Sequence, residues 1–259
     1  MILRSLTKHV KDQNWFAVGL DFIIVVVGVV IGIQVANWNE QRIQDSRANS
    51  YLQRIHADLG ADIDNLRERL VFWQQVSEYG EGGLAYATTG DSANVSPWEL
   101  LLSYFQASQA AEFYTTKSTY EELKSDGALG LIENLELRDQ LARYYLEADN
   151  PVLTERPAYR EQIRGFLPLH IQSYIWKQCF WTSSYSQKLL PCESPISPDE
   201  AMALVTTIST NEHLISALRY WMSTKRVAQL LSKERDRTAH KLRAEIEDII
   251  GTTAVSGRE

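Results

Sequence analysis

The sequence contains few of the residues from which catalytic and metal sites are commonly built. Its 259 residues include only two cysteines and five histidines, and no two histidines share the i,i+4 spacing of a helical metal site. We find no Gly-x-Ser-x-Gly, Cys-x-x-Cys, His-Glu-x-x-His or phosphate-loop motif, each of which fixes a nucleophile, a metal or a phosphate at a defined turn of the backbone. We therefore predict no catalytic residue, no metal site and no cofactor, and we do not expect an enzyme.

An excess of basic residues is also absent. The chain has 26 Lys and Arg against 33 Asp and Glu, which gives a formal net charge of −7. A protein that binds nucleic acid neutralises phosphates with a basic face. The composition therefore excludes nucleic acid as an expected partner.

One segment near the N-terminus has almost no charge. Residues 16–36 read FAVGLDFIIVVVGVVIGIQVA, in which only Asp21 and Gln34 are polar. A helix over these residues covers about 30 Å, the thickness of the hydrocarbon core of a bilayer. Trp15 and Trp38 flank the segment, where indole rings favour the headgroup level. The segment is longer than the apolar region of a signal peptide and lacks its small-residue cleavage site. We predict a transmembrane helix over residues 15–38.

One face of this helix carries small and polar residues. Helical geometry places Asp21, Val25, Gly28 and Gly32 on one stripe, in which Gly28 and Gly32 form a Gly-x-x-x-Gly pair. Small residues at this spacing allow a second membrane helix to approach closely, so the stripe is a candidate oligomerisation face. The alternative is that the glycines are incidental and that Asp21 reaches the nearby interface.

The lengths of the flanking segments favour one orientation. Arg4, Lys8 and Lys11 precede the span and similar basic residues follow it, so charge alone does not decide. Residues 1–14 form only a short tail, whereas residues 39–250 form a long domain, and long domains are exported largely regardless of charge. We expect a cytoplasmic N-terminus and an exported domain. In that compartment Cys179 and Cys192 can form a disulfide bond; the alternative is two unrelated thiols.

The rest of the chain has the periodicity of helices and predicts an all-α fold. Residues 39–79 carry an apolar stripe at spacings of three and four, and Gly80, Gly82 and Gly83 predict the end of this helix. Residues 212–250 predict a helix of similar length, framed by Ser209 and Glu212, that packs antiparallel to the first as the spine of a bundle. Shorter helices are expected over residues 97–111, 119–127, 134–148, 158–167, 171–176 and 198–208, and a frayed tail over residues 251–259.

Local signals mark several of these helix starts. Ser96-Pro97-Trp98-Glu99 and Ser197-Pro198-Asp199-Glu200 have the pattern of a capping box with proline in the first turn. Glu121 and Glu122 follow Ser118 and Thr119 and are expected to serve as capping partners, although an acid–base role is the alternative.

Two stretches resemble a known family. GLDFIIVVVGVVIGIQVANWNEQR is similar to the N-terminal signature of a bacterial family of single-span membrane proteins classed as a domain of unknown function, whose span ends in Q-x-x-N-W-N-E. STYEELKSDGALGLIENLELRDQLARYY is similar to a second segment of that family. Asp21 occupies a position where the family generally has Glu. The resemblance implies a membrane-anchored helical protein of uncharacterised role, and it implies no reaction. Together with the orientation expected above, it predicts a span in the bacterial inner membrane and a domain in the periplasm.

Three classes of function follow from these features. The sequence favours a structural or interaction protein whose partners are the lipid bilayer and either a second copy of itself or a membrane protein complex. A sensory or small-ligand-binding module is the second hypothesis, with an aromatic pocket built from Trp98, Tyr104, Phe105, Tyr144 and Tyr145. An enzyme is the hypothesis that the sequence supports least.

The segment SKERDRTAHK, residues 232–241 of the last predicted helix, has Ala239 as its only apolar residue. It is either a solvated helix face or, with Lys233, Arg235, Arg237, Lys241 and Arg243, a surface that approaches anionic headgroups where the helix returns toward the membrane.

Overall fold

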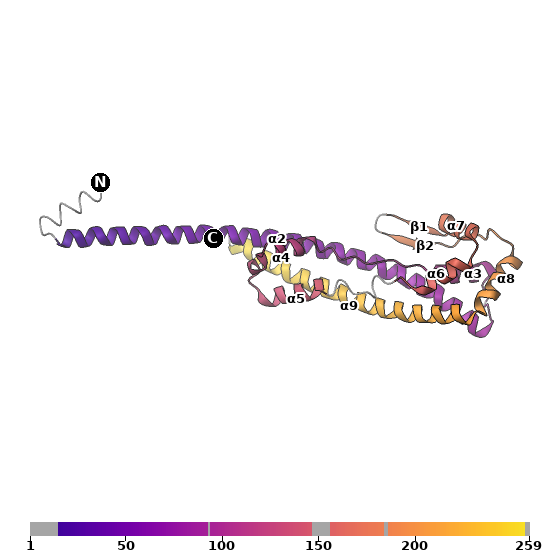
Figure 1. Cartoon of the computed structure of the whole chain (residues 1–259). Coiled ribbons are helices and arrows are strands. Elements are labelled where there is room, and N and C mark those ends of the chain that lie inside the picture. Colours follow the sequence, from indigo (N-terminus) through magenta and orange to yellow (C-terminus); the bar gives the residue numbers. More distant parts are fainter. Residues whose placement is uncertain (1–14, 93, 147–155, 184–185, 257–259) are drawn as a thin grey trace.

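The computed structural model describes residues 15–92, 94–146, 156–183 and 186–256, and it confirms an all-α protein with long antiparallel helices. Helix α2 (Trp15–Thr89) and helix α9 (Glu212–Ser256) form its axis (Figure 1). The other elements lie along this axis: α3 (Pro97–Gln106), α4 (Ser118–Ser125), the 3-10 turn η1 (Ala128–Leu131), α5 (Leu135–Leu146), α6 (Ala158–Phe166), α7 (Leu169–Gln178), β1 (Phe180–Thr182), β2 (Gln187–Leu189) and α8 (Pro198–Ser209).

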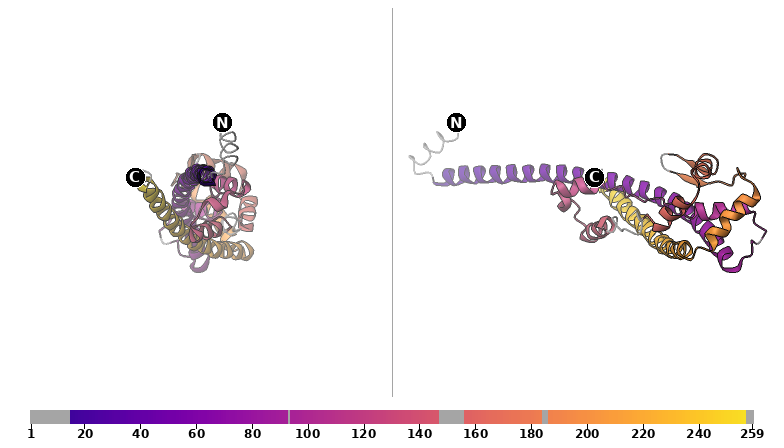
Figure 2. Two further views of the ribbon diagram at one scale, coloured as in Figure 1. Left: turned by 90° about the vertical axis from the view of Figure 1, so that its left-hand side faces the viewer. Right: turned by 45° about the vertical axis from the view of Figure 1, so that its right-hand side comes forward.

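Contacts at both ends of the pair show that α2 and α9 run antiparallel. His56 Nε2 lies 2.6 Å from Glu247 Oε1, whereas Gln229 Nε2 donates to Ser77 Oγ at 3.1 Å. The C-terminal end of α9 therefore lies beside the middle of α2, and the N-terminal part of α2 extends beyond the bundle (Figures 1 and 2).

Helix α2 does not end at the glycines of residues 80–83, as the sequence predicts, but continues to Thr89. The glycines serve close packing. A Cβ atom on Gly80 would lie 2.1 Å from Met222 Sδ, and one on Gly83 would lie 2.9 Å from Tyr104 Cε1. The Tyr104 hydroxyl also donates to the Gly83 carbonyl at 2.8 Å. Packing against α3 and α9 thus offsets the low helix propensity of glycine.

Helix α9 likewise continues past Gly251 to Ser256, beyond its predicted end at Ile250. A Cβ atom on Gly251 would meet no atom within 4 Å. The glycine therefore destabilises the helix only through its low helix propensity, by about 1 kcal/mol relative to alanine. A loss of this size does not end a helix that has already formed.

The helix that begins after Ser96 ends at Gln106 rather than at residue 111. Carbonyl groups in the connection after α3, residues 107–117, accept bonds from buried indole groups. Trp221 Nε1 donates to the Ala107 carbonyl and Trp73 Nε1 to the Ala111 carbonyl, both at 2.9 Å. These bonds satisfy the backbone without a further helical turn.

The helix starts agree with the predicted caps in part. Ser96 and Glu99 form the full capping box, and the Ser197 hydroxyl accepts from the Glu200 amide at 3.2 Å. For α9, Asn211 Oδ1 accepts from the Leu214 amide at 3.1 Å, so Asn211 replaces the predicted Ser209.

The predicted capping role of Glu121 and Glu122 is wrong. Helix α4 has Lys117 at its N-cap position with no capping side chain. Glu122 instead forms an ion pair with Arg54 of α2, because α4 packs against that helix.

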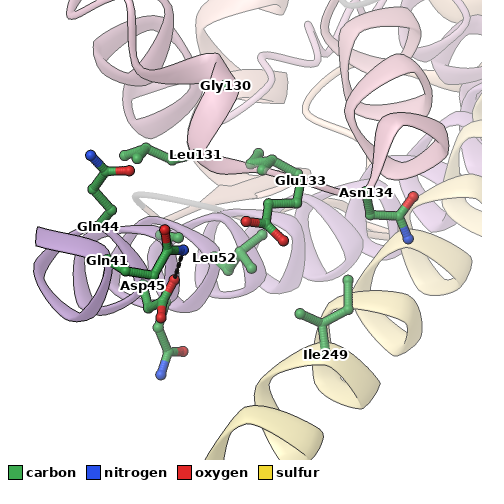
Figure 3. A pocket seen from close by; sticks show the side chains of 12 residues that line it. Gln41, Gln44, Asp45, Leu52, Gly130, Leu131, Glu133, Asn134 and Ile249 are labelled. Atoms are coloured by element: carbon green, nitrogen blue, oxygen red, sulfur yellow. Dashed lines mark hydrogen bonds between the residues drawn. The ribbon is translucent and has the colours of Figure 1, made fainter. Parts of the chain in front are cut away.

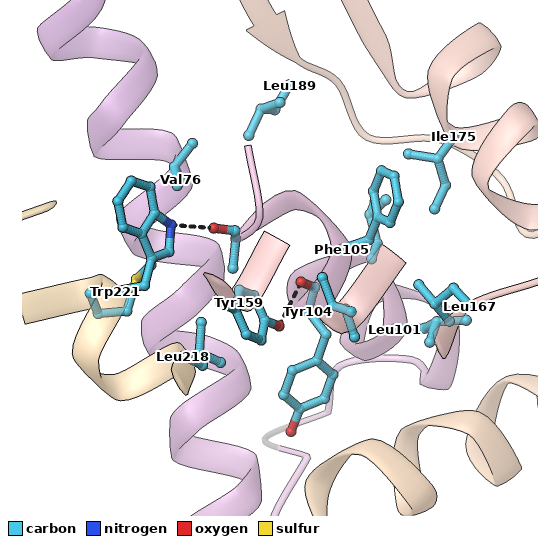
Figure 4. Packing of buried hydrophobic residues seen from close by; sticks show 14 of the residues in the cluster. Val76, Leu101, Tyr104, Phe105, Tyr159, Leu167, Ile175, Leu189, Leu218 and Trp221 are labelled. Atoms are coloured by element: carbon cyan, nitrogen blue, oxygen red, sulfur yellow. Dashed lines mark hydrogen bonds between the residues drawn. The ribbon is translucent and has the colours of Figure 1, made fainter. Parts of the chain in front are cut away.

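Two hydrophobic clusters lie along the α2–α9 axis. The cluster nearer the span packs α4, η1 and α5 against residues 51–63 of α2 and residues 239–246 of α9. The far cluster contains α3, α6, α7 and α8, with large buried side chains such as Tyr104, Phe105 and Trp221 (Figure 4). Tyr159 reaches into it from α6 and donates its hydroxyl to the Tyr104 carbonyl at 2.8 Å. The α2–α9 pair is thus held by shorter helices at two places along its length.

The sequence did not predict the short antiparallel hairpin of β1 and β2, which pairs Phe180 with Leu189 and Thr182 with Gln187. It lies between Cys179 and Cys192, whose sulfur atoms are bonded and whose Cα atoms are 5.2 Å apart, within the range that a disulfide spans. The disulfide is fixed to α3, because Gln106 Nε2 donates to the Cys179 carbonyl and Trp98 Nε1 to the Cys192 carbonyl, both at 3.0 Å.

Candidate functional site

The N-terminal part of α2 is the most unusual surface of the molecule. Within the described residues, one helix has both the length and the apolar composition needed to cross a membrane, and that helix is α2. Of the side chains described between Phe16 and Arg47, all but Asp21 are exposed, including Phe22 (67% exposed) and Ile31 (57% exposed). A continuous apolar surface of this size requires lipid or protein to cover it.

The stripe predicted for oligomerisation is open. A Cβ atom built on Gly28 or Gly32 meets no atom within 4 Å. One carboxylate oxygen of Asp21 is shielded by its own helix and has no hydrogen-bond partner among the described residues. The helix therefore presents a flat, small-residue surface with one polar group that the described residues do not satisfy.

The surroundings of the span are described only on its C-terminal side. The Arg42 guanidinium lies 5.0 Å from the centre of the Trp38 ring, which places an aromatic ring and a cation together at this end of the span. The side chain of Trp15 and the predicted tail of residues 1–14, with Arg4, Lys8 and Lys11, lie outside the described side chains.

Residues 39–50, which we call the stalk, connect the span to the bundle. Hydrogen bonds one turn apart support this helix: Gln44 Nε2 donates to Glu40 Oε1 at 3.0 Å, and Gln41 Nε2 to Asp45 Oδ1 at 2.9 Å. In chain order, Tyr51 is the first buried residue among those described. At about 1.5 Å per residue, burial of α2 side chains in the bundle therefore begins about 18 Å along the helix from Trp38.

A pocket of about 430 Å³ lies where the stalk meets the bundle. Figure 3 shows stalk side chains such as Gln44 and Asp45 on one side, the turn around Leu131 and Glu133 on the other, and Ile249 of α9 nearby. Its described lining is made of amides, two carboxylates and aliphatic groups, without a basic or nucleophilic side chain. This lining gives no sign of a reaction.

The aromatic residues proposed as a pocket lining are core residues. Tyr104 and Phe105 are fully buried in the far cluster, and Tyr144 and Tyr145 are buried in the cluster nearer the span. Burial raises the pKa of the Tyr104 hydroxyl, which donates to the Gly83 carbonyl and serves packing. Trp98 alone among the five lines a described pocket, a shallow one of about 300 Å³ beside Cys192 and Pro198.

The structure also reveals a buried polar cluster that the sequence analysis missed. The Asp62 carboxylate is fully buried and accepts from the Tyr144 hydroxyl and from the Thr116 amide, both at 2.7 Å. Arg235 donates to the Tyr144 carbonyl at 3.1 Å and lies 4.0 Å from the centre of the Tyr144 ring. These contacts join α2, α5 and α9 in the interior.

Burial dominates the electrostatics of this cluster. It raises the pKa of Asp62, and the bonds from Thr116 and Tyr144 and the charge of Arg235 only partly oppose that rise. Burial, followed by the charge of Asp62, raises the pKa of Tyr144 as well. None of the described pockets is lined by Asp62, Tyr144 or Arg235, so we assign the cluster to structure rather than to chemistry.

Residues suited to metal binding are scattered. Among the described residues, no group of three or more His, Cys, Asp and Glu is close enough to hold a metal ion. His56 Nε2 lies 2.6 Å from Glu247 Oε1 and 2.9 Å from Arg243 Nε, while His213 lies 3.1 Å from Gln162. His9 lies outside the described residues.

The hypothesis that residues 232–241 approach the membrane is wrong. Arg243 packs beside Gly60, which lies about 33 Å along α2 from Trp38, and residues 232–241 lie still farther away. Arg235, one of the proposed membrane contacts, is only 7% exposed. Residues 232–241 pair with the part of α2 that follows Gly60. The similar lengths of the two helices predicted from the sequence therefore do not bring this segment to the headgroups.

Comparison of the chain with protein-family models, curated proteins and solved structures finds no match in any of the three.

Proposed function

We propose that this protein is a membrane-anchored structural or interaction protein that self-associates through its span. The observation that carries the proposal is the open face of Asp21, Val25, Gly28 and Gly32 on a helix whose described side chains there are almost all exposed. In lipid, close packing of small residues replaces the hydrophobic effect as the force between helices. A second copy of the span offers a matching surface of small residues.

We further propose that the N-terminus lies in the cytoplasm and the bundle in the periplasm of a bacterial inner membrane. The bonded pair of Cys179 and Cys192 supports this side of the membrane, because disulfides persist in oxidising compartments. The resemblance of the span and of residues 118–145 to a bacterial single-span family supports a location in the bacterial inner membrane. It implies no reaction. On this proposal the stalk holds the bundle clear of the headgroups for contact with other proteins of the complex.

Association of the isolated span in a membrane reporter assay tests this proposal. Replacing Gly28 or Gly32 by Ile should weaken association about tenfold or more, because the added side chain holds the two helices apart. Gly19→Ile is the matched control, because Gly19 lies nine positions from Gly28 and therefore on the opposite side of the helix. Equal association of all the variants would contradict self-assembly through this face.

A further inference from the structure

A second pocket, of about 540 Å³, opens on the side of the bundle between α2, α6 and the β1–β2 hairpin. Its described lining is polar and comes from four parts of the chain: Asn65 and Arg69 of α2; Ala110, Ala111, Glu112 and Tyr114 of the connection after α3; Arg156 and Arg160 at the start of α6; and Ser183 and Gln187 of the hairpin. The volume falls within the range typical of sites for small ligands.

Positive charge is concentrated in this pocket. Its described lining contains three arginines and one carboxylate, Glu112, although the chain as a whole has a net charge of −7. Glu112 is already engaged, because Arg156 Nε donates to it at 2.9 Å and the Tyr114 hydroxyl also donates to it. These hydrogen bonds lower the pKa of Glu112 and keep it ionised.

Two of the arginines are partly withdrawn from water, and each donates a hydrogen bond to a neutral oxygen atom. Arg160 Nη1 donates to the Ser108 carbonyl at 2.9 Å, and Arg69 Nη1 donates to Gln187 Oε1 at 3.4 Å. Burial lowers the pKa of both residues, and the like charge of Arg156 lowers that of Arg160 further. Buried guanidinium groups are costly unless an anion compensates them.

A fourth arginine lies behind the pocket wall and adds to the imbalance. Arg164 Nε donates to Ser108 Oγ at 3.2 Å and Nη2 donates to Gln109 Oε1 at 3.0 Å. Burial, followed by the charge of Arg160, lowers the pKa of Arg164 to about 10. Three arginines thus line a space in which the described residues supply one shared carboxylate, and Arg164 adds a positive charge close to Arg160.

We propose that this pocket binds a small molecule through a carboxylate or phosphate group held between Arg69, Arg156 and Arg160. Planar guanidinium groups donate paired N–H groups that match both kinds of oxyanion. Asn65, Ser183 and Gln187 add neutral polar groups around the charged centre. The disulfide holds the hairpin against the bundle, so the side chains that it contributes are positioned before the ligand enters. The site is independent of the proposed association of the span.

Isothermal titration of the full-length protein in non-ionic detergent tests the proposal, with inorganic phosphate and succinate as separate probes at constant ionic strength. We expect saturable binding of at least one probe, with a Kd of about 1 mM or tighter, and the better probe identifies the preferred oxyanion. Arg156→Gln should weaken binding about tenfold, because it removes one charge and releases Glu112 to repel the ligand. Arg67→Gln is the control, since Arg67 is an exposed arginine of α2 outside the described lining.

The variant Glu112→Gln gives a change in the opposite direction. It removes the competing carboxylate and frees Arg156, so it should bind the preferred probe about tenfold more tightly, which a misfolded variant does not do. The proposal is overturned if neither probe binds up to about 10 mM. It is also overturned if Arg67→Gln weakens binding as much as Arg156→Gln, or if Glu112→Gln leaves the affinity unchanged.

Discussion

Gly82 and Gly83 are adjacent in α2, yet the structure gives them opposite sensitivities to substitution. A Cβ atom on Gly83 would press on the ring of Tyr104, which is fully buried and bonded to the Gly83 carbonyl, whereas one on Gly82 would lie 4.0 Å from Ser103 Oγ. We expect Gly83→Ala to lower the free energy of unfolding by about 1–3 kcal/mol and Gly82→Ala to raise it by about 0.5–1 kcal/mol.

Chemical denaturation of the full-length protein in detergent measures both changes. If the two variants shift stability in the same direction and by the same amount, the close contact between α2 and α3 at Gly83 is not as described.

Asp62 should make the free energy of unfolding fall as the pH rises, which is opposite to the effect of a carboxylate whose pKa is lowered by folding. Because burial raises the pKa of Asp62, the folded protein binds this proton more tightly than the unfolded chain does. The contribution of Asp62 to the free energy of unfolding should therefore fall as the pH rises from the unfolded pKa, about 4, through the raised folded value. The fall amounts to about 1.4 kcal/mol for each unit by which folding raises the pKa.

Comparison with Asp62→Asn isolates this contribution, since that variant lacks the titrating group and retains the other carboxylates. The stability of the variant relative to the wild type should increase with pH over this window. A relative stability that decreases with pH would show that folding lowers the pKa of Asp62.

At the scale of elements, sequence patterns predicted the two long helices, and the similar lengths of these helices predicted their antiparallel pairing. Residues 59, 66, 73 and 76 of α2 are apolar, and the positions between them that complete the alternating spacing of three and four are Asp62 and Arg69, both buried. The same spacing in α9 buries Lys225, Ser232 and Arg235. These polar residues interrupt the hydrophobic pattern along the packing face. Their positions nevertheless continue the alternating spacing of three and four that identifies this face.

Pockets and short elements depended on tertiary contacts that a sequence pattern does not contain. The arginine pocket combines Arg69 with Arg156, Arg160 and the hairpin, which are far apart in the sequence. The hairpin has strands of only three residues, too short for an alternating pattern to be recognised. The disulfide and the bonds to α3 are what hold it in place.

The disulfide gives a prediction at this scale. Non-reduced full-length protein isolated from membranes should have a mass two hydrogens below that of the reduced protein, with no thiol that reacts after unfolding. Replacing both cysteines by alanine should lower the free energy of unfolding by about 3 kcal/mol, the chain-entropy cost of opening a loop of this size. Two thiols that react in unfolded, non-reduced protein would contradict the bond.

At the scale of the whole molecule, α2 gives the protein its proportions. Its 75 residues extend about 110 Å, and none of the side chains described in the span and stalk, its first half, is buried. On the proposal above, α2 links the membrane to the domain, so association of the spans would bring the domains together at a fixed height above the bilayer.

The side of the membrane on which the bundle lies is the most direct test of this arrangement. Alkaline phosphatase fused to the C-terminus of the full-length protein folds only in an oxidising compartment, and we expect it to be active. A green fluorescent protein at the same position, exported by the same route, should be dark. An inactive phosphatase with a bright fluorescent fusion would place the bundle in the cytoplasm and contradict a cytoplasmic N-terminus followed by a single span.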